Sequence, residues 1–580
     1  MIINYEACGN TFIFNPNLEH DITQSEMNSL IKKAHEAKDK TCLDYIRTVE
    51  LIECQDMNYR MTIVSLFVLF SRPSFSVEYN RLVNESYDLI KSYKKAFYNI
   101  LDFDAEVKKF IGNIDLKNAR AVMEDIFEKI QSSIEIMLLN EQIRNLKKDY
   151  ILVVKELKTY YFENLPLNCR GIIIRKGDEN LRNLLAFEYL MPIVKSSQVI
   201  LENTYVAISH LNNELIIEPS IEKISLVKKI QDDVLYKIID QPSYSNSPIK
   251  MFAPLSNTRH IDIITSNDWF YGYGPIKSEF LFMTKNYIPS QKEQVEYYLK
   301  FFSKMKGKEI IVSVPNFGPL KQNSLTKDAF TDLITLEKYE RLYTINMESI
   351  AEASLIAGTP VKVIVPMIRI KEEVIFWTEL IQDAFEIAGA EKPEVGIYFE
   401  TESAYEFYED YKDLDFAIIG LNDLIEEITD DYTRYDELTK EEFLDVFWPH
   451  LRDLHQYLRT YMLQVRHMVS GNLLKNPNIF RKLLASGFRE FCIPAQFIRC
   501  CESSIDRYTR TRGTFIGVAA QRFERKMMIK QQEEQMSDLE RLMRKVEKLK
   551  RKRQRQKENR QRFLNKQKLK KSTIIDNINQ

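Results

Sequence analysis

Short apolar strands alternate with helical stretches through the second half of the sequence. We expect strands in HIDIITS (260–266), from Tyr273 to Lys277, and in EIIVSVPN (309–316), VKVIVPMI (361–368), VGIYFE (395–400), LDFAIIG (414–420), LQVRHMVS (463–470) and EFCIPA (490–495). Eight strands over about 245 residues match the size of a (β/α)8 barrel. Because such barrels carry their functional groups at the C-terminal strand ends, the residues of interest are Lys277, Ser313, Asn316, Glu400, Asn422, Asp423 and Ser470.

Two regions of different character precede this barrel. Residues 21–148 repeat apolar side chains every three or four positions among Lys and Glu, which predicts a helical domain. Residues 149–220 contain YILVV, GIII, YVAIS and ELIIEP, which are typical of strands, and one helix is expected from Asn180 to Leu190. The pair Asn212-Asn213 predicts a hairpin turn, because Asn tolerates the positive φ that such turns need. We therefore expect a small α/β domain after the helical one.

Composition separates the C-terminal end of the chain from the rest. The net charge is −2, but the segment from Arg541 to Gln580 has 16 Lys+Arg against 3 acids, so it carries +13 and the remainder carries −15. We place a linker at residues 221–250, the barrel at 251–502 and a basic helical tail at 503–580. Sixteen glycines among 580 residues favour a helix-rich protein with few phosphate-binding loops.

The sequence lacks the signals of secreted, membrane and zinc proteins. The N-terminus MIINYEACGN has no basic region and no small-residue cleavage site. The longest apolar run, Met61 to Phe70, is about half the length that spans a bilayer. The seven cysteines show no C-x-x-C pair, which favours reduced thiols over a zinc site or a disulfide framework. We therefore expect a cytoplasmic protein.

Several blocks of the sequence resemble enzyme I of the bacterial sugar phosphotransferase system, the phosphoenolpyruvate–protein phosphotransferase. In the barrel they are GPIKSEFLFMTKNYIPSQKEQ, VPMI, GIYFETESA, DFAIIGLNDL and GFREFCIPA. Upstream, YILVVKEL, GIII, LMPIV and NTYVAISHLNNELIIEP resemble its swivel domain. The resemblance covers about residues 20 to 502. It implies a small α/β swivel domain with a first strand segment in residues 1–20, an inserted helical domain, and a (β/α)8 barrel that binds phosphoenolpyruvate.

The resemblance also implies a mechanism with several required groups. In the family, a swivel histidine takes a phosphoryl group from phosphoenolpyruvate bound with Mg²⁺ in the barrel, and passes it to a small carrier protein. This chemistry needs an imidazole nucleophile, arginines that hold the phosphate, and two carboxylates that bind the metal. The resemblance implies a homodimer through the barrel as well.

The metal ligands of the family are retained, whereas its phosphate ligands are altered. Glu400 in F-E-T and Asp423 in L-N-D-L align with the two Mg²⁺-binding carboxylates, and Asn422 aligns with the neighbouring asparagine. The alternative is that these acids are helix caps or face water at the barrel rim. Lys277 and Ser313 align with family arginines, and a lysine cannot make the bidentate phosphate contact of a guanidinium.

Further along the same loop, Asn316, Pro319 and Leu320 align with an aspartate and glycines of the family, and Gly318 is kept. Arg434 could supply the later arginine of the family if one residue is inserted after Asp423. The remaining phosphate-binding set is therefore Lys277, Asn422 and Arg434, with a weakened Mg²⁺ site beside it.

Two positions that in the family transfer a phosphoryl group and a proton carry unsuitable side chains here. The segment K-G-D-E-N-L-R-N-L-L-A aligns Leu181 with the phospho-accepting histidine, and none of the seven histidines lies within 25 residues of Leu181. An ordinary helix N-terminus capped by Asp178 or Asn180 explains this segment. Phosphorylation of Asp178 or Glu179 is an alternative, although carboxylate nucleophiles normally lie beside a Lys or Arg and a metal. Ser470 aligns with the cysteine acid of the family, and a hydroxyl is a weaker acid than a thiol.

The basic tail has no counterpart in the family. Met536, Leu539, Met543 and Val546 predict at most a short coiled coil. The charge of residues 541–571 favours contact with a polyanion, either nucleic acid or an anionic membrane. A solvated helix, or a helix docked on the acidic body, would explain the same charge.

Three hypotheses follow. The first is a degenerate enzyme I-like protein that acts by binding phosphoenolpyruvate, a phosphocarrier protein or an intact enzyme I. The second is a working phosphotransferase with an unconventional acceptor. The third is a scaffold whose tail, from Arg541 to Lys571, binds a polyanion.

Overall fold

The computed structural model describes residues 5–14, 24–51, 70–86, 88–103, 116–144, 146–239, 249–266, 270–285, 287–317, 321, 333–406, 411, 414–429, 448–461 and 466–510. The chain divides into two units, Met1–Ile505 and Asp506–Gln580. Of the second unit, the structure describes the last residues of α19 (Ile498–Arg510). The predicted helical tail and its charged segment therefore lie outside the described residues.

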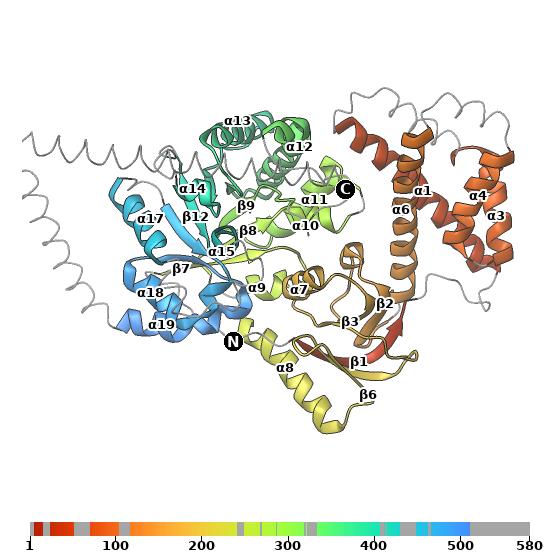
Figure 1. Cartoon of the computed structure of the whole chain (residues 1–580), viewed down its shortest axis with the longest axis horizontal. Helices are drawn as coiled ribbons and strands as arrows, with labels where there is room; N and C mark the ends of the chain where they lie inside the picture. The colour runs from red at the N-terminus through yellow and green to blue at the C-terminus, as the bar shows by residue number, and fades with distance from the viewer. Residues whose placement is uncertain are drawn as a thin grey trace, which may run out of the picture. The chain divides into compact units, whose positions relative to one another are not determined.

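A six-stranded mixed sheet forms the sheet domain (Figure 1). Its order is β4 (Ile193–Lys195), β3 (Cys169–Lys176), β2 (Tyr150–Glu156), β1 (Glu6–Ile13), β5 (Tyr205–Ser209) and β6 (Glu214–Ile217). Strand β1 runs parallel to β2 and antiparallel to β5. The turn between β5 and β6 contains Asn213 at φ 48°, which confirms the predicted hairpin.

Side chains of β2 alternate between two apolar layers, as the twofold period of a strand requires. Leu152 and Val154 belong to a large core shared with the helical segments, whereas Ile151 and Val153 face a smaller core. Helix α7 (Glu179–Glu188) and the short η1 (Thr159–Phe162) lie on the side of the large core. Both faces of the sheet are thus covered.

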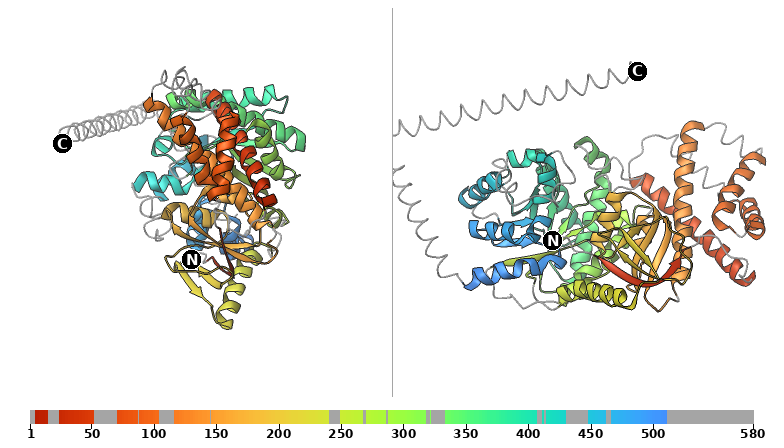
Figure 2. Two further views of the ribbon diagram at one scale, coloured as in Figure 1. Left: turned by 90° about the vertical axis from the view of Figure 1, so that its right-hand side faces the viewer. Right: turned by 60° about the horizontal axis from the view of Figure 1, so that its bottom comes forward.

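The helical segments between β1 and β2 are α1 (Gln24–Leu51), α3 (Pro73–Ser86), α4 (Leu89–Phe103) and α6 (Leu116–Ile143). Helices α1 and α6 pack side by side, as do α3 and α4 (Figure 2). Edge-to-face aromatic contacts join them, with Phe97 and Phe127 at 4.7 Å and Phe75 and Tyr93 at 5.1 Å between ring centroids. Because β1 precedes these helices and pairs with β2 after them, the helices are an insertion into the sheet domain.

Eight parallel strands close into the predicted barrel. They are β7 (Lys250–Leu255), β8 (Gly272–Lys277), β9 (Glu309–Ser313), β10 (Val361–Val365), β11 (Val395–Phe399), β12 (Phe416–Gly420), β13 (Arg466–Ser470) and β14 (Glu490–Cys492). The interior is filled by apolar side chains, among them Phe252, Ile364 and Met468. Gly274 in β8 has φ 116°, and a Cβ there would lie 2.1 Å from the Ile311 carbonyl oxygen, so only glycine fits.

The helices of the barrel region are α9 (Ile261–Thr265), α10 (Glu279–Met283), α11 (Gln291–Phe302), α12 (Leu333–Ala357), α13 (Lys371–Ile387), α14 (Glu402–Glu406), α15 (Leu421–Thr429), α17 (Trp448–Tyr461) and α18 (Pro477–Ser486), with the short turns η5 (Asn472–Lys475) and η6 (Ala495–Phe497). Helix α8 (Ile221–Ile239) connects the sheet domain to β7. No helix within the described ranges is long and apolar enough to span a membrane.

The first barrel strand was predicted at the wrong place. Residues 260–266 were expected to form it, but residues 261–265 form helix α9, and the strand is β7. Ile261 and Ile264 are both buried at a spacing of three, which suits a helical turn. The segment KMFAPL contains a proline and is not among the predicted strands, yet Met251, Phe252 and Ala253 are all buried in the barrel wall.

Ion pairs hold the N-terminal rim of the barrel. Arg466 at the start of β13 pairs with Glu309 of β9 and Glu490 of β14. Lys250 of β7 approaches Glu490 at 3.2 Å, and Lys362 of β10 approaches Glu309 at 3.7 Å. Polar groups at this end of the barrel serve stability, in contrast to those at the opposite end.

Candidate functional site

The C-terminal mouth of the barrel collects the residues that the sequence singled out at strand ends. Lys277, Ser313 and Ser470 are the last residues of β8, β9 and β13. Glu400 directly follows β11, and Asp423 lies in the first turn of α15, immediately after β12. Because the strands are parallel, these residues reach one end of the barrel.

Glu400 and Asp423 are in direct contact. The Glu400 side chain is buried, shares a hydrogen bond with Asp423, and accepts a hydrogen bond of 2.8 Å from the Met367 backbone N–H at Oε1. Burial first, and then the charge of Asp423, hold the pKa of Glu400 well above its ordinary value. Two carboxylates this close cannot both be charged at low cost, so the pair retains a proton.

A lysine that the sequence analysis missed approaches the same carboxylates. Lys321 Nζ donates to Glu279 Oε1 at 2.9 Å, and its charge acts on Asp423 and Glu400 as well. Burial lowers the pKa of Lys321, but the charges of Glu279 and Asp423 outweigh burial, and the pKa lies above its ordinary value. Lys321 is therefore a cation at the mouth. Its only sequence signal was its place directly after the altered phosphate loop.

Lys277 is not free to meet a ligand, because the sheet domain supplies its partner. Its ammonium group forms an ion pair with Glu188, the last residue of α7. Only 10% of the Glu188 side chain is exposed, so the pair is shielded from solvent on that side. A carboxylate thus lies against the cation that aligns with a phosphate-binding arginine of the family.

Other contacts join the sheet domain to the barrel around this ion pair. Lys285, after α10, pairs with Glu163, beside η1. Asn257 Nδ2 donates to the Glu188 backbone carbonyl at 2.8 Å. The Arg259 guanidinium donates to backbone carbonyls on the sheet side, including that of Leu165 at 2.9 Å. The two domains are therefore held together by polar contacts.

The aligned nucleophile position lies in the first turn of α7. Leu181 is partly buried and packs against the large core, and its backbone N–H donates to Asp178 Oδ1 at 2.9 Å. Asp178 is thus the N-cap residue of α7 and one of the two caps that the sequence predicts. Among the residues that the structure describes, no metal-binding group forms at Asp178 or Glu179, and Glu179 forms an ion pair with Arg182.

One histidine lies close to this helix in space although it is distant in sequence. His210 Nδ1 is 2.8 Å from the Ile193 carbonyl oxygen, which also accepts from Arg182 at 3.3 Å. Burial lowers the pKa of His210, so its ring is neutral at pH 7. The hydrogen bond places the proton on Nδ1 and leaves Nε2 with a lone pair.

A thiol occurs beside the aligned proton-donor position. Ser470 of β13 pairs in register with Cys492 of β14. The Cys492 Sγ–H donates to the Gly274 carbonyl oxygen at 3.3 Å, and burial raises the pKa of this thiol to about 12. Cys492 belongs to the barrel interior, so it is a poor acid there, and the sequence comparison did not point to it.

Comparison with known proteins shows to which proteins this chain is similar. A model of the PEP-binding domain of PEP-utilising enzymes matches residues 237–508. A phosphoenolpyruvate-protein phosphotransferase of Buchnera aphidicola subsp. Baizongia pistaciae is 26% identical over 364 residues, covering 56% of this chain and 61% of that protein. This chain is an enzyme I-like homologue. The predicted resemblance and the predicted barrel are both confirmed.

Two further relatives carry the same name as the first. That of Buchnera aphidicola subsp. Schizaphis graminum is 22% identical over 437 residues, covering 69% of this chain and 74% of the relative. That of Listeria monocytogenes is 23% identical over 337 residues, covering 53% and 57%. The matched part of this enzyme I-like homologue thus spans about three-fifths of the first relative and less of the third.

Asn422 and Ser313 at the mouth of the enzyme I-like homologue make hydrogen bonds within the chain. Asn422 Oδ1 accepts from the Asn472 backbone N–H at 2.9 Å, so this amide braces the turn after β13. Ser313 donates to the Val314 carbonyl oxygen and is buried. Arg434, Pro319 and Leu320 lie outside the described residues. Glu188 and Lys321 are the mouth residues that sequence reasoning did not find.

Two further histidines of the barrel region, His455 and His467, contact each other. His455 Nδ1 and His467 Nε2 are 2.9 Å apart, and the His455 ring stacks on Phe488 at 3.8 Å between centroids. Within the described residues, no group of three or more His, Cys, Asp or Glu side chains is arranged to hold a metal. A divalent cation at Glu400 and Asp423 would therefore need further oxygens from water or a ligand.

Proposed function

We propose that this enzyme I-like homologue has lost phosphoryl transfer through the swivel-domain histidine and acts by binding. The observation that carries the proposal is the ion pair between Glu188 and Lys277. In this arrangement the sheet domain, which corresponds to the expected swivel domain, covers the phosphate-binding end of the mouth with a carboxylate. Leu181 at the acceptor position, which cannot carry a phosphoryl group, supports the same conclusion.

Glu400 and Asp423 would hold Mg²⁺ in this proposal. The pair fits a divalent cation, because the two acids already touch and share a proton that a cation could replace. Bound there, Mg²⁺ would neutralise the charge of a phosphorylated ligand. Lys321, which its hydrogen bond to Glu279 holds at the mouth, would supply a second positive charge. Phosphoenolpyruvate is the ligand that the family suggests.

The partners follow from the same reasoning. A phosphocarrier protein or an intact enzyme I would be bound without receiving a phosphoryl group, and a second copy would pair through the barrel. Incubation of the full chain with labelled phosphoenolpyruvate, Mg²⁺ and a phosphocarrier protein tests the proposal. We expect no acid-labile label on this chain and none on the carrier, beside a positive control with an active enzyme I. Stable transfer of label to either protein would overturn it.

A working phosphotransferase with an unconventional acceptor remains the second candidate, and one observation favours it. His210 is neutral, has an available Nε2, and shares the Ile193 carbonyl oxygen with Arg182 of α7. If label were found on this chain, His210→Asn should abolish it. His35→Asn, in the helical segment where His35 contacts Asn80 at 3.2 Å, is the matched control.

A further inference from the structure

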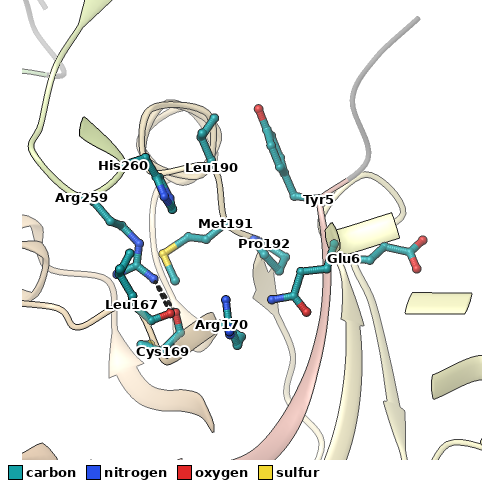
Figure 3. Close-up of a pocket in the computed structure, with 11 residues that line it drawn as sticks. Tyr5, Glu6, Leu167, Cys169, Arg170, Leu190, Met191, Pro192, Arg259 and His260 are labelled. Carbon is teal, nitrogen blue, oxygen red and sulfur yellow. Dashed lines mark hydrogen bonds between the residues drawn. The ribbon is translucent and has the colours of Figure 1, made fainter. Parts of the chain in front are cut away.

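A small cavity lies between the sheet domain, helix α8 and the loop before α9 (Figure 3). Its volume is about 40 Å³, which holds about three water molecules. The polar groups that line it are Arg170 of β3, Gln231 of α8, Arg259 and His260 from the barrel side, and Glu6 of β1. Met191 adds an apolar surface. None of the mouth residues lines the cavity.

Arg259 brings a buried positive charge to this cavity without an acidic partner. Its two Nη atoms donate to backbone carbonyls, those of Leu165 and Pro166 at 2.9 Å and that of Cys169 at 2.6 Å. Its Nε has no hydrogen-bond partner, and no carboxylate of the described residues forms an ion pair with this guanidinium. A buried cation of this kind is costly unless a counter-charge is supplied.

The other two charged residues of the lining, Arg170 and Glu6, form ion pairs with residues outside the lining. Arg170 Nε lies 2.9 Å from Asp149 Oδ2, and Glu6 Oε2 lies 3.9 Å from Lys223 Nζ. Lys223 also lies 3.6 Å from Glu214, so the charged residues of the lining itself are Arg170, Arg259 and Glu6, two positive and one negative. The cavity therefore favours one small anion.

His260 adds a hydrogen-bond acceptor to the lining of the cavity. Its Nε2 is 3.3 Å from the Tyr189 carbonyl oxygen and donates to it, whereas Nδ1 is buried without a partner. Burial, and then the charge of Arg259, lower the pKa of His260 to about 4, so Nδ1 is an unprotonated acceptor at neutral pH. Figure 3 shows Arg170, Arg259 and His260 around the same space.

An anion that fits must accept hydrogen bonds from guanidinium groups and also donate one to His260. Hydrogenphosphate does both, because it has charged oxygens and one hydroxyl group. Sulfate has no proton at neutral pH and cannot donate. The volume suits a free ion better than a phosphate monoester with an organic group.

We propose that this cavity binds one inorganic phosphate ion between Arg170, Arg259 and His260. The ion would connect β3 with the loop that precedes α9, and would thereby hold the sheet domain against the barrel. The proposal does not depend on phosphoenolpyruvate or Mg²⁺ binding at the mouth.

Equilibrium dialysis of the full chain against labelled inorganic phosphate tests this proposal. We expect one saturable site per chain, weaker competition by sulfate, and competition by phosphoenolpyruvate no stronger than by sulfate. Arg170→Gln should raise the dissociation constant about tenfold or more, because it removes a charge-assisted hydrogen bond. Arg259→Gln should raise it further, although the loss of its carbonyl contacts could unfold the chain, so Arg170→Gln is the deciding variant.

Two control variants separate this cavity from other sites. Arg175→Gln alters the same strand, but its guanidinium donates to the Ser196 carbonyl oxygen at 2.9 Å and does not line the cavity. Lys277→Gln alters the mouth. Neither should change phosphate binding. The proposal is overturned if no saturable binding occurs up to ~10 mM phosphate, if Arg170→Gln binds like the unaltered chain, or if Lys277→Gln abolishes binding. Equal affinity for sulfate would overturn the hydrogen bond to His260.

Discussion

Glu188 at the end of α7 forms an ion pair with Lys277 at the end of β8, although the two residues are 89 positions apart. This contact joins the last turn of a helix in the sheet domain to the mouth of the barrel. It places a carboxylate against the lysine that aligns with a phosphate-binding arginine of the family. Ligand binding at the mouth and docking of the sheet domain should therefore compete.

The competition predicts that Glu188→Gln strengthens phosphoenolpyruvate binding. Removal of the carboxylate frees Lys277, and the loss of an ion pair worth up to about 1 kcal/mol should improve the affinity about fivefold. Isothermal titration with Mg²⁺ present measures this. Glu163→Gln is the matched control, because it breaks the ion pair with Lys285 at the same domain contact without freeing Lys277. Equal affinity gains in both variants would show that looser docking, and not Lys277, is responsible.

The Glu400–Asp423 pair predicts a pH dependence of stability. The pKa of Glu400 is raised above its ordinary value of 4.5, so the folded chain keeps a proton that the unfolded chain releases. The free energy of unfolding should then fall as pH rises above 4.5, by about 1 kcal/mol per pH unit until Glu400 ionises. Urea unfolding between about pH 5 and pH 8 measures this slope.

Two comparisons test whether the Glu400–Asp423 pair causes this pH dependence. Glu400→Gln should flatten the pH dependence, because the amide does not ionise. Added Mg²⁺ should flatten it as well and should stabilise the chain most at high pH, since the cation replaces the proton. A slope that Glu400→Gln leaves unchanged would rule out this pair as its source.

The rim of ion pairs predicts a stability role for Arg466. Arg466→Met leaves Glu309 and Glu490 without their shared cation, and we expect a loss of about 1–3 kcal/mol in the free energy of unfolding. Arg452→Met is the control, because Arg452 is exposed and, among the described residues, forms an ion pair with the adjacent Asp453 alone; it should have almost no effect. Similar losses in the two variants would contradict a special role for the rim.

The charge of residues 541–580 predicts salt-sensitive polyanion binding. Deletion of this segment removes 16 basic and 3 acidic residues and should abolish binding to a heparin column or to single-stranded RNA. In the full chain, the logarithm of the affinity should fall linearly with the logarithm of salt concentration. Binding that survives the deletion with the same slope would place the polyanion site elsewhere.

Much of the fold could be predicted because its signals are local. Alternation of short apolar runs and helices predicted the barrel, and the Asn-Asn pair predicted the hairpin between β5 and β6. The first strand was misplaced, because HIDIITS and KMFAPL differ little in apolar content and only closure of the barrel decides which of them pairs with β8 and β14.

The sequence by itself determined the fold class, the leucine that aligns with the phospho-accepting histidine of the family and the charge of the C-terminal segment, since residue identity and short-range periodicity suffice for these. Only the tertiary structure decided that Glu188 meets Lys277, that Lys321 approaches Glu279, and that Arg259 is buried beside Arg170. These contacts join segments far apart in the chain. Their partners depend on how helices and strands pack, and no local spacing records that packing.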